Sequence, residues 1–237
     1  MKELSRNIPV NVKKILREEV NFVCPVPDCL NPYLEWHHFD PPWSKMKHHN
    51  PEGMIALCCE HHIQADNGAF TDNQLFSFKK NAKKLNKLTS GKFNWMRNKL
   101  LIVVGGNFYW ETPIIFKYRC FPIIWFERDL NNNLLLNLRM LTSSKKSRAY
   151  IVNNEWYNTG KEEDIICPPS SKKLQIKYNN GDFVSIEFIE LLNLEMIKKN
   201  IPIQIVKIGI SNFQLLLLKL IKELEILILV LLLKIQL

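Results

Sequence analysis

The histidines and most of the cysteines of this chain are gathered into one short stretch. All six histidines and four of the six cysteines lie between residues 24 and 62. The stretch contains, in order, Cys24, Cys29, His37, His38, His48, His49, Cys58, Cys59, His61 and His62. Zinc prefers thiolate sulfur and imidazole nitrogen as ligands. This density of suitable ligands therefore predicts a metal site.

Two closely spaced ligand pairs are a common way for a short segment to hold zinc. We predict that the ligands of a structural Zn²⁺ are Cys24, Cys29, Cys58 and His61. This assignment leaves His37, His38 and His62 available for a second role. A purely structural zinc site is the simplest alternative, but it has no use for the adjacent pair His37 and His38. His48 and His49 lie in the polar stretch KMKHHNPEG, which is typical of a solvated loop.

Disulfide bonds offer another explanation for the cysteines, but they need an oxidising compartment. Residues 1–19 are charged throughout and contain no apolar segment of the kind that a secretory signal requires. We therefore expect an intracellular, cytoplasmic protein with reduced thiols. Cys120 and Cys167 have no histidine near them in the sequence, so we expect core or surface thiols there.

The chain is strongly basic, with a formal net charge of +9 and a pI near 9.2. Such a charge favours an anionic partner, such as the phosphate backbone of a nucleic acid. No acidic residue occurs from Asn73 to Trp110. The candidate nucleic-acid-binding residues in this stretch are Lys79, Lys80, Lys83, Lys84 and Lys87. A solvated lysine face explains the same run equally well.

Periodicity and turn signals predict the elements that must position these residues. The expected elements are a helix that begins at Pro9 and ends before Cys24, a strand at 34–39, a strand at 54–57, a short helix at 58–66 and a basic helix after Thr71. Thr71 and Gln74 have the spacing of a capping box. Successive strand residues point to opposite faces. His37 and His38 can therefore face one substrate only if the strand ends at this pair. The following Asp40-Pro41-Pro42 favours such an ending.

Three segments of this region, LEWHHFDPPW, HNPEGMIALC and CCEHHIQAD, resemble the HNH endonucleases, which are also called ββα-metal nucleases. The four predicted zinc ligands resemble the zinc knuckle of many members of that family. The resemblance covers residues 6–80. It implies an α+β fold with an N-terminal ββα-metal unit, which would hydrolyse phosphodiester bonds of DNA with the help of a divalent cation.

The resemblance also implies roles for individual residues. His38 matches the general base that takes a proton from the attacking water. His37 and His62 match the ligands of the catalytic cation, for which Mg²⁺ is the first expectation and Mn²⁺ or Ni²⁺ the alternatives. Gly53 stands where the family usually has the asparagine that orients the base. We assign that role to Asn50, three residues earlier, with His49 or a backbone carbonyl as alternatives.

The remainder of the chain has a different character. We predict a nuclease domain at 1–98, an antiparallel β domain of unknown role at 99–200, and a Leu/Ile-rich segment at 201–237 that forms a C-terminal hydrophobic helix. Asn180-Gly181 marks the clearest hairpin turn. The uncharged run at 226–233 is far shorter than the roughly 18 residues that a membrane-spanning helix needs. We therefore expect a buried or self-associating helix, with membrane attachment as the minor alternative. Homo-oligomerisation would then use the β domain or this helix.

The sequence thus predicts a metal-dependent HNH-type nuclease that acts on DNA and needs no small-molecule cofactor. The alternative from another class is a non-catalytic zinc-knuckle module that binds nucleic acid. The two hypotheses differ at His38, because a binding module tolerates its loss and a nuclease does not. A toxin or defence effector that uses the same chemistry would carry the same residues.

Overall fold

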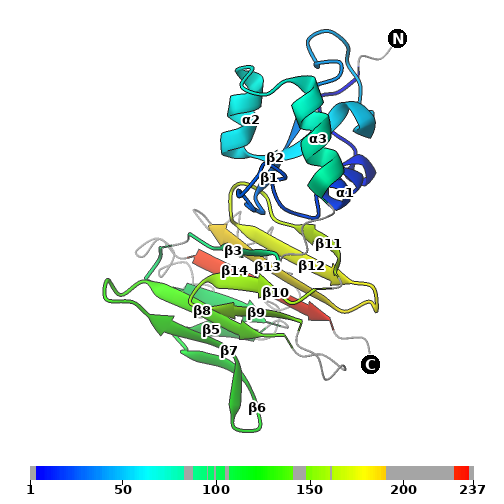
Figure 1. Cartoon of the computed structure of the whole chain (residues 1–237). Helices are drawn as coiled ribbons and strands as arrows, with labels where there is room; N and C mark the ends of the chain where they lie inside the picture. The colour runs from blue at the N-terminus through cyan, green and yellow to red at the C-terminus, as the bar shows by residue number, and fades with distance from the viewer. Residues whose placement is uncertain are drawn as a thin grey trace.

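The structure, a computed structural model, describes residues 4–82, 88–94, 96–98, 100–104, 107–140, 148–160, 162–190 and 227–234. The fold is α+β, as predicted. Figure 1 shows that the helices gather in an N-terminal unit at one end of the molecule, while the rest of the described chain is a β region. The candidate metal ligands all belong to the N-terminal unit.

The N-terminal unit is built from helices around one short sheet. Its elements in chain order are α1 (Val10–Glu19), β1 (Leu34–His38), the 3-10 helix η1 (Pro51–Gly53), β2 (Met54–Cys58), α2 (Cys59–Asp66) and α3 (Asp72–Ala82). β1 and β2 pair antiparallel, with His37 opposite Ile55 and His38 opposite Met54. Helix α2 packs on both strands. This arrangement places His37 of β1 beside His62 of α2, with their ring centres 5.3 Å apart.

Local sequence signals explain two of these helices. Val12, Leu16 and Val20 recur at helical spacing, and all three are buried against the core of the unit. The predicted capping box at the start of α3 is confirmed. The backbone N–H of Gln74 donates to the Thr71 hydroxyl at 3.3 Å, and the backbone N–H of Thr71 donates to the Gln74 side-chain oxygen at 2.9 Å.

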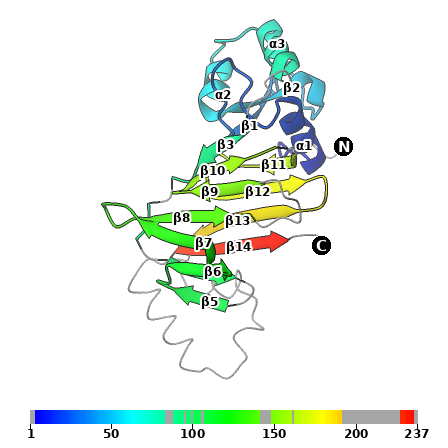
Figure 2. The ribbon, with the colours of Figure 1, turned by 60° about the horizontal axis from the view of Figure 1, so that its bottom comes forward.

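The β region is a sandwich of two six-stranded sheets (Figure 2), with the strand orders β3-β10-β9-β8-β7-β6 and β11-β12-β13-β14-β4-β5. The strands are β3 (Ser90–Lys92), β4 (Leu100–Val104), β5 (Asn107–Trp110), β6 (Ile114–Tyr118), β7 (Phe121–Arg128), β8 (Leu134–Arg139), β9 (Ala149–Val152), β10 (Glu155–Asn158), β11 (Glu162–Ile166), β12 (Lys173–Tyr178), β13 (Phe183–Glu190) and β14 (Leu227–Lys234). One hydrophobic cluster joins the two sheets, and it includes Trp156 of β10 and Ile176 of β12.

The β region is mostly antiparallel, as predicted. Among the described strands, only the pairing of β14 with β4 is parallel. The expected hairpin turn at Asn180-Gly181 joins β12 to β13, and Gly181 has the positive φ of 85° that such a turn favours. Strand β3 lies within residues 1–98 and pairs with β10, so the β region begins before residue 99.

The predicted C-terminal helix is corrected for the part of residues 201–237 that the structure describes. Leu227–Lys234 forms strand β14, which pairs with β13 on one side and β4 on the other. A short unbroken apolar run fits a buried helix and a buried strand equally well, so its periodicity could not decide. Residues 201–226 and 235–237 lie outside the described residues. Within the described part of the chain, no helix has the length and apolarity needed to cross a membrane.

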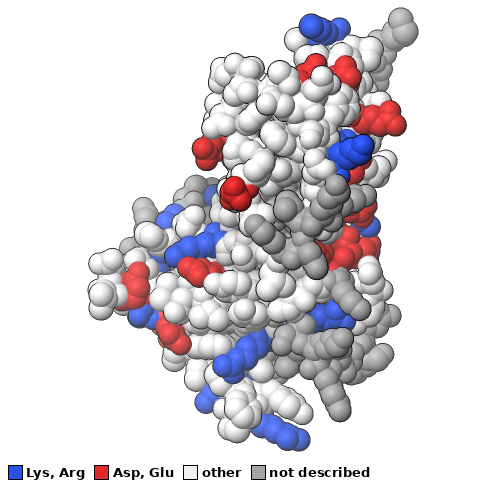
Figure 3. Space-filling view, viewed as in Figure 1, with Lys and Arg blue, Asp and Glu red and all other residues white. Residues whose placement is uncertain are grey.

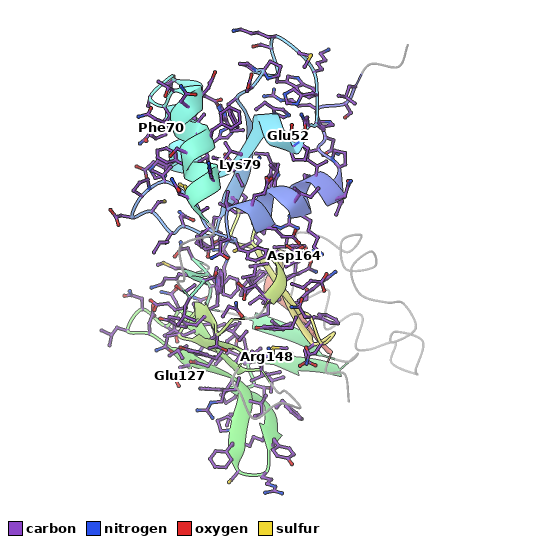
Figure 4. The ribbon with its side chains drawn as sticks, turned by 45° about the vertical axis from the view of Figure 1, so that its right-hand side comes forward. Glu52, Phe70, Lys79, Glu127, Arg148 and Asp164 are labelled. Atoms are coloured by element: carbon purple, nitrogen blue, oxygen red, sulfur yellow. The ribbon has the colours of Figure 1, made fainter. Side chains whose placement is uncertain are left out.

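A buried ion pair joins the N-terminal unit to the β region. Arg17 of α1 donates from Nε and Nη2 to the two carboxylate oxygens of Asp164 at 2.8 and 2.7 Å, and both side chains are 7% exposed. The Arg17 guanidinium also lies over the ring of Trp36, the neighbour of His37 in β1. Figure 4 shows Asp164 at the edge of the β region that faces the N-terminal unit. Losing one partner of such a pair typically costs about 3–5 kcal/mol.

Candidate metal centres

The four residues predicted to bind zinc lie together. The ligand atoms of Cys24, Cys29, Cys58 and His61 are all within 4.8 Å of one another. The Sγ atoms of Cys29 and Cys58 are 3.7 Å apart, and His61 Nδ1 is 3.1 Å from Cys58 Sγ and 3.4 Å from Cys24 Sγ. Tetrahedral zinc with ordinary bond lengths separates its ligand atoms by roughly 3.5–3.8 Å. The group could therefore hold a metal ion such as zinc.

Backbone geometry brings these ligands together. The loop that carries Cys24 and Cys29 turns sharply, with positive φ at Asp28 and Leu30. Cys58 ends β2 and is the N-cap residue of α2, whose first turn supplies the fourth ligand. Burial raises the pKa of the Cys24 and Cys29 thiols, so their thiolate forms need a cation for stabilisation.

Cys59 is the residue most easily confused with a zinc ligand, because it directly follows Cys58. Its side chain is exposed, whereas Cys58 is 1% exposed and faces the other candidate ligands. Cys59 also stands outside the four-residue group. The structure therefore favours Cys58 over Cys59 as a ligand.

A second group of possible ligands consists of His37, His62 and Asp66. His37 Nδ1 is 3.1 Å from one carboxylate oxygen of Asp66, and His62 Nδ1 is 3.4 Å from the other. Glu35 approaches His62 Nδ1 to 3.6 Å. Burial lowers the pKa of His37 and so favours the neutral imidazole, which is the form that binds metals. Two imidazoles and a carboxylate suit a divalent cation that keeps open positions for other ligands.

Sequence reasoning missed Asp66. The residue lies four positions after His62 in α2, so both side chains lie on one face of the helix. This spacing was the available signal. The signal is weak, because an aspartate near the end of a short helix is usually solvated, and the Asp66 side chain is 57% exposed.

His38 occupies the last position of β1, and its ring is held by a backbone carbonyl. Its Nε2 lies 3.0 Å from the carbonyl oxygen of His48. A carbonyl can only accept, so Nε2 carries the proton and Nδ1 is left as a proton acceptor. Burial lowers the pKa of His38 to about 4, and the neighbouring His48 contributes to this lowering. His38 is therefore neutral at neutral pH.

The side chain of His48 fixes the loop that holds His38. This role of His48 could not be inferred from the sequence. Its Nε2 donates to the Pro41 carbonyl at 2.8 Å, and its Nδ1 accepts from the backbone N–H of Asn50 at 3.1 Å. The side chain of Asn50 accepts from the Glu52 backbone N–H at 3.2 Å and so caps η1. Asn50 thus contacts His48 and not His38. The hydrogen-bond partner of His38 is a backbone carbonyl, which is one of the alternatives to Asn50 predicted from the sequence.

Gly53 lies at a position where the backbone leaves no room for a side chain. A Cβ atom at this position would lie 1.7 Å from the carbonyl oxygen of Asp40, which no side chain can tolerate. The Gly53 carbonyl accepts from the backbone N–H groups of Phe39 and Asp40 at 3.0 and 3.2 Å. This close approach ties η1 to the end of β1, beside His38.

His38 and the second ligand group open into the same cavity, which has a volume of about 490 Å³. His37, His62 and Asp66 line it together with His38, and Arg6 and Trp43 form other parts of its wall. The strand ends at His38, so adjacent histidines can serve one cavity despite strand alternation.

The predicted nucleic-acid-binding lysines fall into three groups. Lys79 is used within the N-terminal unit, because its ammonium pairs with Glu19 at 2.9 Å, donates to the carbonyl oxygens of Pro51 and Met54, and is only 11% exposed. Lys79 therefore stabilises the fold and is not free to contact a phosphate. Lys80 is exposed. Lys83, Lys84 and Lys87 lie outside the described residues.

Comparison of the chain with protein-family models, with curated proteins and with solved structures found no match. The chemistry assigned to this chain therefore depends on its own residues and their geometry.

Proposed function

We propose that this protein is a metal-dependent HNH-type endonuclease that hydrolyses phosphodiester bonds of DNA. The observation that carries the proposal is the shared cavity, where a histidine with a free acceptor nitrogen lies beside a His, His, Asp ligand group. The Cys₃His group is separate from it. A structural zinc ion and a catalytic cation can therefore have different sites in one unit.

Each part of the cavity has a chemical role in this proposal. His38 Nδ1 accepts a proton from the water that attacks phosphorus, while the His48 carbonyl holds the ring in place. His37, His62 and Asp66 would hold a divalent cation, which would stabilise negative charge on the phosphoryl oxygens. Mg²⁺ suits the carboxylate, and Mn²⁺ and Ni²⁺ suit the mixed donor set. Arg6 on the cavity wall can contact a phosphate group.

Weakening the ligand group should change the metal dependence of cleavage. His62→Ala and Asp66→Asn each remove one donor, so each should raise the concentration of Mg²⁺ or Mn²⁺ needed for half-maximal plasmid cleavage by at least about tenfold. The measurement is a metal titration of initial cleavage rates. Asp72→Asn is the matched control, because Asp72 lines the same cavity but stands outside the ligand group. Wild-type titration curves for both ligand variants would show that the cation is held elsewhere.

A further inference from the structure

Strands β6 and β7 form a hairpin that projects from the end of the β region opposite the N-terminal unit (Figure 1). Among the described strands, β6 is the outermost strand of its sheet and pairs with β7 alone. Tyr118 and Phe121 are paired at the end of the hairpin, and Arg119 and Cys120 form the turn between them. Ile115 and Ile123 are buried in the shared core of the sandwich and anchor the base of the hairpin.

The end of the hairpin exposes an unusual share of aromatic surface. Every residue from 116 to 121 is exposed. Phe116, Tyr118 and Phe121 are 43%, 55% and 61% exposed. Side chains placed directly opposite on paired strands lie on the same face, so Tyr118 and Phe121 share one face of the hairpin. Exposed apolar clusters of this kind usually mark a contact surface.

The charges at this surface are all positive. Lys117 and Arg119 alternate with the aromatic residues, and no acidic residue occurs from 114 to 126. The Arg119 guanidinium lies 5.6 Å from the ring centre of Tyr118. In Figure 3 the end of the molecule that this hairpin forms shows blue and white atoms but no red ones. The surface therefore suits an anionic partner with flat rings.

We propose that the β6–β7 hairpin binds unpaired bases of a nucleic-acid strand. Aromatic side chains supply faces on which bases stack, and interleaved cations contact the phosphates. A second copy of this chain fits less well, because two such ends would bring like charges together. The inference rests on the proposed function for the class of partner, and it adds a second anchor for the substrate, remote from the candidate catalytic cavity.

The test is binding of the full chain, with its structural zinc retained, to a fluorescent thirty-nucleotide oligo(dT) in buffer without added divalent cation, followed by anisotropy. Replacing Phe116, Tyr118 and Phe121 together with alanine should weaken binding by at least about fivefold, the least that loss of one stacked base would cause. Arg119→Gln should make the slope of the logarithm of the binding constant against the logarithm of the salt concentration shallower by roughly one unit, because one phosphate contact is lost. The matched control is Leu130→Ala, because Leu130 is fully exposed in the turn after β7 and should not change the affinity.

An unchanged oligo(dT) affinity in the triple variant overturns the proposal. The same holds if that variant changes only self-association in sedimentation or binding to anionic lipid vesicles. All three side chains are exposed, so thermal unfolding should match the wild type. The assay needs no cleavage, so the two proposals fail separately. If the protein binds oligo(dT) through the hairpin but does not cleave DNA, only the proposed nuclease activity is refuted. If the wild-type protein cleaves DNA and the triple variant binds oligo(dT) normally, only the proposed role of the hairpin is refuted.

Discussion

Replacing His38 with alanine is expected to abolish DNA cleavage, with a loss of at least about 10²-fold, which is the usual worth of a general base. The structure gives the reason. His38 Nε2 is committed to the His48 carbonyl, so Nδ1 is the only ring nitrogen that can accept the proton of water. His38 is not part of the Cys₃His group, so zinc content should stay at the wild-type level. The measurements are the initial rate of plasmid cleavage and elemental analysis of the same preparation.

His49→Ala is the matched control for this experiment. Its ring lies 6.0 Å from that of His38 and stacks on Trp43, and its Nε2 donates to the Ser5 carbonyl. It is an imidazole in the same loop with no proposed part in the chemistry, so activity should remain within about tenfold of wild type. If His38→Ala also stayed within that range, the base would have to be another group, or the unit would be a binding module.

Replacing Cys58 with serine should remove the zinc ion and unfold the N-terminal unit. Cys58 is 1% exposed, and it joins β2 to α2 at the centre of the four-ligand group. In small zinc domains metal binding supplies much of the folding free energy, about 10–16 kcal/mol in isolated zinc-finger peptides. We expect elemental analysis to show less than one equivalent of zinc, and hydrogen exchange to show lost protection in α1, β1 and β2.

Cys59→Ser is the control for the cysteine experiment, since the neighbouring thiol is exposed and outside the group. This variant should keep its zinc and its amide protection. One equivalent of zinc retained by Cys58→Ser would contradict the assignment. So would loss of zinc in Cys59→Ser, because it would exchange the roles of the two cysteines.

Ligand spacing made much of the N-terminal unit predictable. Two short pairs of ligands must converge to bind one ion, and the structure brings Cys24 and Cys29 to Cys58 and His61. The capping signal at Thr71 and the apolar spacing in α1 also correspond to observed elements. These features depend on neighbouring residues, so a single sequence contains the information needed to predict them.

Features that depend on distant or crowded contacts could not be predicted. Strand β14 pairs with β4 although Leu227 and Leu100 are far apart in the sequence, and an apolar run does not reveal its partner. Lys79 belongs to a basic run by composition, yet its ammonium is enclosed by the unit. The His48 carbonyl that holds His38 cannot be recognised from the sequence, because every residue has a backbone carbonyl.

Cleavage of supercoiled plasmid by the purified full chain, with and without added divalent cations, tests the central claim most directly. The protein should be inactive in EDTA. Protein that has not been exposed to EDTA, and therefore keeps its structural zinc, should give nicked and linear products with Mg²⁺, Mn²⁺ or Ni²⁺, while His38→Ala should stay inactive with every metal. Cleavage that persists in EDTA, or intact plasmid with all three cations, would contradict the assignment of this chain as a metal-dependent nuclease.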